Sequence, residues 1–95
     1  MEISGRAVST ERKSISVRVL TFARVRELIG VGELELTLPV GADAEACFEH
    51  LVELCAELAP LRHRLLVAVN ECYSGWQEPL TDGDVVVFVP PVSGG

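Results

Sequence analysis

The sequence predicts an α+β fold in which one long helix covers one face of a mixed β-sheet. Two segments typical of strands precede a single long amphipathic segment, and two more follow it. A helix between two strand pairs forms a crossover connection, so the first and last strands can lie parallel at the centre of the sheet. The 95 residues suit a single domain, and an apolar share of 48% is enough to bury a core.

The first half of the chain predicts two strands joined by a short helix. Residues 14–22 alternate apolar and polar side chains, which is typical of a half-buried strand. Residues 23–29 are expected to form a short helix that ends at Gly30. Residues 33–38 again alternate, with glutamate or threonine between leucines, and predict the second strand.

The long helix is predicted from apolar residues spaced three and four apart. They run from Ala44 to Leu58, which corresponds to about four turns. Asp43 is expected to cap the start of the helix, and Pro60 follows its end. Cys47 and Cys55 lie on the apolar side of the pattern. The glutamates of the polar side are Glu45, Glu49, Glu53 and Glu57.

Two apolar segments complete the predicted sheet. Residues 65–69 and 85–89 are apolar at every position and read as the third and last strands. The segment 71–79 between them is expected to be irregular, and residues 81–84 (Thr-Asp-Gly-Asp) predict a turn. The whole pattern is that of a ubiquitin-like β-grasp fold. Its domain is expected to span residues 15–89.

Charge and composition argue against several classes of function. Residues 15–95 carry a net charge of −7, whereas binding of nucleic acid requires clustered lysine and arginine. The apolar runs are far shorter than the roughly 20 residues of a membrane-spanning helix. Residues 1–14 are polar, show no apolar signal segment, and are expected to be a disordered extension.

The cysteines and histidines indicate neither a disulfide framework nor a metal site. Three cysteines cannot all pair, and the spacing of cysteine and histidine does not suggest zinc. Neither His50 nor His63 has a neighbour at the spacing of a metal site or a catalytic triad. Reduced cysteines and the lack of an apolar signal segment lead us to expect a cytosolic protein. We also expect that the chain itself binds no metal or cofactor.

The C-terminal residues 90–95 form the most informative motif. A strand runs directly into two prolines, which hold the chain extended, and two glycines follow. The expected result is an extended arm with a thin, flexible tip that can enter a narrow channel, where its α-carboxylate is the only reactive group. The residues expected to pass into a partner's active site are Pro90, Pro91, Val92 and Ser93, before Gly94 and the reactive Gly95.

The last strand also predicts an apolar surface. If Val86 and Phe88 face the helix, the other valines of the strand face outward. An exposed apolar patch usually marks an interface, although a covering loop would serve as well. The patch residues expected here are Val85, Val87 and Val89, with Leu20 and Phe22 from the first strand.

Four segments resemble the small subunits of molybdopterin synthase. They are residues 21–30 (TFARVRELIG), 67–70 (VAVN), 80–84 (LTDGD) and 90–95 (PPVSGG). The likeness covers roughly residues 15–95 in the right order, and the last segment is its most specific part. The resemblance implies a sulfur-carrier protein with a β-grasp fold.

The resemblance also implies a mechanism and partners. An enzyme related to ubiquitin activators would use ATP to adenylate Gly95, and a sulfurtransferase activity would convert it to a thiocarboxylate. The tail would then enter the active site of a large catalytic subunit, in a heterotetramer of two small and two large subunits. Sulfur would pass to cyclic pyranopterin monophosphate to form the dithiolene of molybdopterin. The resemblance places Phe22, Tyr73 and Val89 on the docking surface.

Three other functions stay open at this point. The chain could carry sulfur to thiamine synthesis or to tRNA thiolation, although residues 22–30 and the Pro-Pro-Val-Ser segment favour molybdopterin. It could be a ubiquitin-like modifier joined to target lysines; its own single lysine is Lys13. It could also be an interaction domain whose tail is inert.

Overall fold

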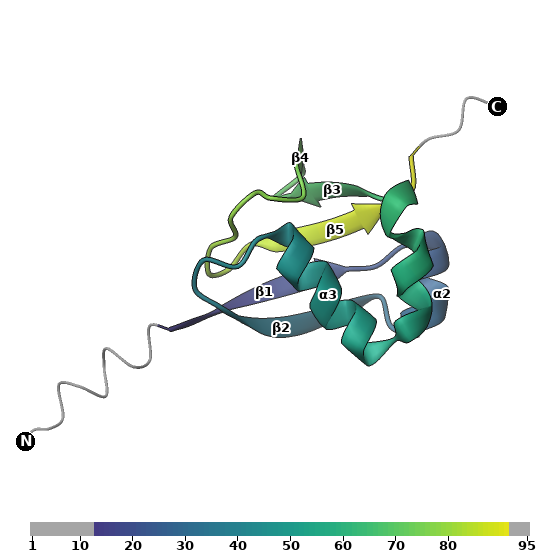
Figure 1. The fold of residues 1–95 in the computed structure, drawn as a ribbon, viewed down its shortest axis with the longest axis horizontal. Helices are drawn as coiled ribbons and strands as arrows, with labels where there is room; N and C mark the ends of the chain where they lie inside the picture. Colours follow the sequence, from purple (N-terminus) through teal and green to yellow (C-terminus); the bar gives the residue numbers. More distant parts are fainter. Residues whose placement is uncertain (1–12, 92–95) are drawn as a thin grey trace, which may run out of the picture.

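The computed structural model describes residues 13–91 and has the predicted α+β architecture (Figure 1). In chain order its elements are β1 (Ser14–Leu20), α2 (Ala23–Ile29), β2 (Glu33–Pro39), α3 (Ala44–Leu54), the 3-10 helix η1 (Ala56–Arg64), β3 (Leu66–Val69), β4 (Cys72–Ser74) and β5 (Val85–Val89). Strands and helices alternate up to α3, a 3-10 helix then follows, and the last three elements are strands.

The strands form one mixed sheet in the order β2-β1-β5-β3-β4. The first strand, β1, pairs in parallel with the last, β5, and Val19 lies opposite Val86. All the other pairings are antiparallel. The predicted parallel contact between the first and last strands is therefore confirmed, and β5 lies between two strands with hydrogen bonds on both sides.

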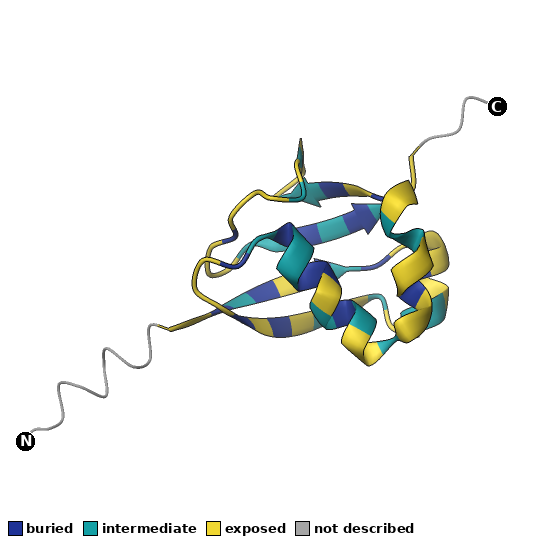
Figure 2. Ribbon diagram, in the orientation of Figure 1, coloured by how far each residue is buried: buried dark blue, intermediate teal, exposed yellow. Residues whose placement is uncertain are grey.

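One face of the sheet is covered by α3 and η1, and the core lies beneath them (Figures 1 and 2). The strands contribute every second side chain to it, because successive side chains of a strand point to opposite faces. Phe48 of α3 meets Phe88 of β5 edge to face, with ring centroids 5.2 Å apart. Other fully buried core residues include Val17, Val19, Leu38, Leu51, Leu58, Val67 and Val86.

The long helix is shorter than the pattern predicts. It ends at Leu54, because Cys55 adopts an extended backbone (φ −148°, ψ 97°), and the chain continues as η1. Pro60 lies inside η1, where its missing N–H and its ring disfavour an α-helix through residues 56–60. Leu58 lies in η1 and is nevertheless fully buried in the core. The sequence pattern therefore identified Leu58 correctly as a core residue, but it predicted the wrong type of helix around it.

The segment expected to be irregular contains a strand. Residues 72–74 pair with β3 as the edge strand β4, with Tyr73 opposite Ala68. A tight turn joins the two strands, and both of its residues, Asn70 (φ 51°) and Glu71 (φ 74°), are left-handed. Such turns usually carry glycine at the second position, so Asn-Glu gives no sequence signal of a hairpin.

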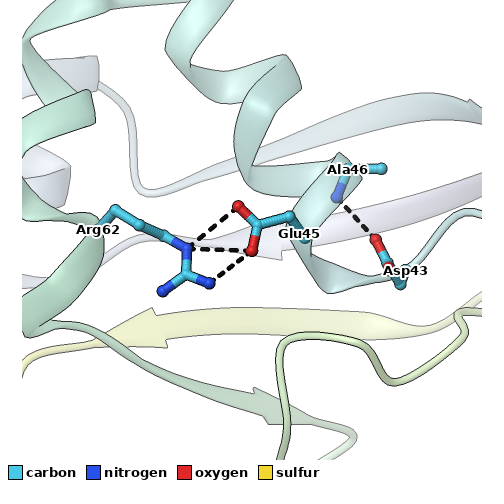
Figure 3. Close-up of polar contacts among 4 residues, drawn as sticks. All are labelled: Asp43, Glu45, Ala46 and Arg62. Carbon is cyan, nitrogen blue, oxygen red and sulfur yellow. Dashed lines mark hydrogen bonds and ion pairs between the residues drawn. The ribbon is translucent and has the colours of Figure 1, made fainter.

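Polar contacts fix the two helices against each other (Figure 3). The Asp43 carboxylate accepts a hydrogen bond of 2.9 Å from the Ala46 backbone N–H, which confirms the predicted helix cap. The guanidinium of Arg62 in η1 holds the carboxylate of Glu45 in α3. The same guanidinium lies 3.4 Å from the centre of the Trp76 ring. These contacts join α3, η1 and the segment that leads to β5.

Within residues 13–91, no helix combines the length and the apolar character needed to cross a membrane.

Candidate functional site

The C-terminal tail begins at the end of the central strand β5. Pro90 and Pro91 follow Val89 directly, and both prolines are exposed. Because β5 is hydrogen-bonded to β1 on one side and β3 on the other, the tail starts from a firmly held base. The predicted channel-entering residues Val92 and Ser93 and the predicted reactive residues Gly94 and Gly95 lie outside the described residues, and their roles stay predictions.

The start of β5 is held by a polar network around Asp84. The Asn70 side chain donates a hydrogen bond of 2.9 Å to the Asp84 carboxylate and accepts one of 2.9 Å from the Val85 backbone N–H. Thr81 donates to the same carboxylate through its backbone N–H (2.8 Å) and its hydroxyl (3.1 Å). The network ties the turn before β5 to the end of β3, and so sets the register of the strand that carries the tail.

These hydrogen bonds also lower the pKa of Asp84. Desolvation by itself would raise the pKa, but the donors from Thr81 and Asn70 stabilise the charged form and outweigh it. The carboxylate therefore stays ionised below the ordinary range of aspartate.

The face of the sheet turned away from the helices is apolar along β5. Val86 and Phe88 are fully buried on the helix side, whereas Val85, Val87 and Val89 are only half-buried. This is the alternation that the sequence predicts. On β1 the same holds, because Val19 is fully buried while Leu20 is partly exposed.

Neighbouring strands extend this apolar strip across the sheet. Leu20 lies opposite Val87, Val87 opposite Ala68, and Ala68 opposite Tyr73, so one row runs from β1 to β4. Tyr73 is 71% exposed and Phe22 is 49% exposed. We call this surface the open face and define it by Leu20, Phe22, Leu66, Ala68, Tyr73, Val85, Val87 and Val89.

The open face includes two residues that the sequence did not single out, Leu66 and Ala68. Leu66 is 43% exposed and lies opposite Val89. Because residues 65–69 are apolar at every position, periodicity could not tell which side faces outward. The pairing of β3 with β5 places Leu66 and Ala68 on the outward side, opposite Val89 and Val87. On the side of β2, the open face meets a salt bridge of 3.3 Å between Arg18 and Glu33.

The described residues carry no arrangement typical of a catalytic centre. Burial raises the pKa of the Cys47 thiol to about 12, so this cysteine stays protonated in the core. Among residues 13–91, no group of three or more histidine, cysteine, aspartate or glutamate side chains is placed to hold a metal ion. The features that point to function are thus the base of the tail and the open face.

Comparison with known proteins identifies the family. The sequence profile of the ThiS family matches residues 19–95. The molybdopterin synthase sulfur carrier subunit of Escherichia coli is 43% identical over 84 residues, which cover 83% of this chain and 99% of that protein. The same subunit of Arabidopsis thaliana is 36% identical over 87 residues, covering 92% and 91%. The chain therefore belongs to the ThiS family and, within it, to the molybdopterin synthase sulfur carrier subunits.

Solved structures agree in fold. A Pyrococcus furiosus protein, solved as a candidate subunit 1 of molybdopterin converting factor, superposes with a TM-score of 0.75 at 36% identity, over 82% of this chain and 99% of that one. A chain from the complex of subunits 1 and 2 of the Helicobacter pylori molybdopterin-converting factor has a TM-score of 0.57 at 23% identity, over 85% and 100%. The second likeness shows the fold alone.

Proposed function

We propose that this chain is the sulfur carrier of a molybdopterin synthase and that Gly95 carries the sulfur. The observation that carries the proposal is the family match, which runs through the central strand and continues to the last residue of this sequence. Two features of the described residues also support the proposal: β5 holds the start of the tail, and the open face provides an apolar surface. Both features suit a protein that presents its end to partners.

The chemistry begins with activation of the Gly95 α-carboxylate. A carboxylate is a poor electrophile, so one of its oxygens first attacks the α-phosphate of ATP and pyrophosphate leaves. A sulfur donor at the oxidation level of sulfide then attacks the carbonyl carbon, and AMP leaves with the former carboxylate oxygen. The product is a thiocarboxylate, a sulfur nucleophile on a tether. ATP is used by the activating enzyme and is not a cofactor of this chain.

The thiocarboxylate then donates its sulfur in the active site of a large subunit. We propose that Pro90, Pro91, Val92 and Ser93 line up in a narrow channel of that subunit, with Gly94 and Gly95 at its end. Glycine suits such a channel because a Cβ atom would collide with the walls. The acceptor is cyclic pyranopterin monophosphate, and two sulfur transfers complete the dithiolene. In this complex the catalytic groups belong to the large subunit, and this chain is the donor.

The open face is the proposed docking surface for the large subunit. A contiguous apolar patch on a small domain usually marks an interface, and long-lived complexes use the more apolar interfaces. The Helicobacter pylori relative in fold was solved together with its subunit 2, which supports a partner of this kind. We propose an assembly of two small and two large subunits, formed in the cytosol.

The test is reconstitution with the activating enzyme, a sulfide donor, ATP, the large subunit and the pterin precursor. The full chain is expected to yield molybdopterin. A chain lacking Gly94 and Gly95, and a chain with one residue added after Gly95, are both expected to yield none while still binding the large subunit. An extended chain that is fully active with the added residue still attached would contradict the mechanism.

A further inference from the structure

A cavity of about 310 Å³ opens beside the start of the tail, between α2 and η1. Part of its lining is apolar, since Val25 and Leu65 are buried core residues. Two arginines, one from each helix, also line it, and both are exposed. The lining residues are Arg24, Val25, Leu61, Arg64, Leu65 and Pro90. The hollow thus combines an apolar wall with two positive charges next to the first residue of the tail.

This positive charge stands out in an acidic protein. The sequence as a whole has a net charge of −6. The Arg24 guanidinium forms an ion pair with the Glu27 carboxylate, with 3.1 Å between nitrogen and oxygen, and both side chains are largely exposed. Exposed ion pairs of this kind contribute little to folding stability. Within residues 13–91, no carboxylate lies within ion-pair distance of Arg64. Arg64 can therefore bind an anionic group from outside without breaking an ion pair within residues 13–91.

We propose that this cavity receives an acidic side chain of the activating enzyme, at the mouth of the channel that takes the tail. The inference rests on the proposed function, because it requires a partner that adenylates Gly95. The carboxylate would lie between the guanidinium groups of Arg24 and Arg64, and the carbon chain of the acidic residue would pack against Leu61 and Val25.

Distance argues against the nucleotide as the occupant of the cavity. The tail has six residues from Pro90 to Gly95, and an extended chain of this length spans about 20 Å. A nucleotide bound at Gly95 in a channel would lie at the far end of that span. The group beside Pro90 is then part of the channel wall, which belongs to the enzyme.

The position of the cavity favours the activating enzyme over the large subunit. None of its lining residues belongs to the open face, which we assign to the large subunit, and only Pro90 is shared with the tail segment that we place in the channel of that subunit. Activation is a transient encounter, and charged groups at the rim of an interface mainly increase the rate of association and lower the probability of wrong partners. An acidic protein gains most from such steering where its own positive charge is concentrated.

Charge reversal at Arg64 tests the proposal. We would measure the exchange of pyrophosphate into ATP by the activating enzyme as a function of carrier concentration, for the full chain and for Arg64→Glu. Lys13→Glu is the matched control, because it makes the same change in net charge at the start of β1, the opposite end of the sheet from the start of the tail. Thermal unfolding and binding to the large subunit are measured on the same three proteins.

The expected result is a rise of about tenfold in KM for Arg64→Glu at low salt, with kcat unchanged, and a smaller rise at high salt. Lys13→Glu should change KM by less than about twofold at the same ionic strength. Binding of the large subunit should be the same for all three proteins. If the unmodified chain supports no exchange at all, the proposed function itself fails, whatever the variants do.

Five outcomes would overturn the inference while leaving the proposed function intact. Equal KM values for Arg64→Glu and Lys13→Glu would show that the cavity makes no contact with the enzyme. A loss confined to kcat would point to the nucleotide, and a loss confined to large-subunit binding would point to the other partner. A fall in KM would show that the cavity holds the chain's own terminal carboxylate. A variant with reduced stability but normal KM would likewise restrict Arg64 to a structural role at the end of η1, where basic residues favour the helix dipole.

Discussion

At the scale of single residues, Asp84 shows how a turn residue controls the strand that carries the tail. Its carboxylate accepts hydrogen bonds from Thr81 and Asn70, and Asn70 in turn holds the first backbone N–H of β5. The charged carboxylate is stabilised in the folded protein, so its pKa lies below the ordinary value. Folding stability must therefore depend on pH through this residue.

We expect Asp84→Ala to lower the free energy of unfolding by about 1 kcal/mol at pH 7, because hydrogen bonds to a partly exposed carboxylate are lost. A lowered pKa contributes stability that is present above the unfolded pKa of about 3.9 and is lost as the pH falls through the folded pKa. The difference between the two proteins should therefore shrink when urea unfolding is repeated near pH 3. An equal difference at both pH values would refute this role.

A second prediction at this scale concerns the tip of the tail. Gly95→Ala adds one methyl group beside the reactive carboxylate, and we expect at least a tenfold loss in the rate of adenylation, which corresponds to about 1.4 kcal/mol. The physical reason is the collision of Cβ with the walls of a narrow channel. Exchange of pyrophosphate into ATP measures it, and Ser93→Ala, which removes only a hydroxyl, is the control. Full activity of Gly95→Ala would exclude a channel that admits only glycine.

Sequence reasoning at the residue scale placed part of the open face correctly. Val87 and Val89 were predicted to face outward on the condition that Val86 and Phe88 face the helix, and the structure meets that condition. Leu66 and Ala68 were missed, because residues 65–69 are apolar at every position and only the register with β5 orients that strand. The cavity beside Arg64 could not be foreseen either, because it depends on how η1 packs next to α2.

At the scale of elements, the two faces of the sheet have different roles. One face packs against α3 and η1 and forms the core, while the other carries the open face. Phe22 and Leu54 allow a matched comparison, because both are exposed apolar side chains but only Phe22 belongs to the open face.

We expect Phe22→Ala to weaken binding to the large subunit by at least tenfold, because exposed aromatic residues often dominate the energy of an interface. Leu54→Ala should bind as the unmodified chain does. Neither change is expected to lower the unfolding temperature by more than a few degrees, since both side chains are largely solvated in the free protein. Titration calorimetry gives the affinities. Equal affinities for the two variants would show that the partner does not dock on the open face.

Most of the elements could be predicted from the sequence, and the exceptions have physical reasons. Alternation of apolar and polar residues indicated β1 and β2, short continuous apolar runs indicated β3 and β5, and the glycine after Ile29 marked the end of α2. The change from α3 to η1 was missed because the apolar spacing continues through Cys55 to Leu58, so the sequence pattern does not show the extended backbone at Cys55. Strand β4 has three residues and exists only through its pairing with β3.

At the scale of the whole molecule, the structure places the start of the tail at the end of a strand inside the sheet. The parallel contact of β1 and β5 gives β5 a neighbour on each side, so the base of the tail is held by the sheet. The crossover made by the long helix is what allowed this topology to be predicted from the sequence. The handling of the tail by partners could not be predicted in detail, because it depends on surfaces that other proteins supply.

The most direct test of the central claim is the intact mass of the protein, purified from cells that make molybdenum cofactor. We expect a fraction of the chain to be heavier by the exchange of one oxygen for one sulfur, and this fraction to disappear when Gly95 is removed. An unchanged mass, in cells where the activating enzyme is present and active, would contradict the role as a thiocarboxylate carrier.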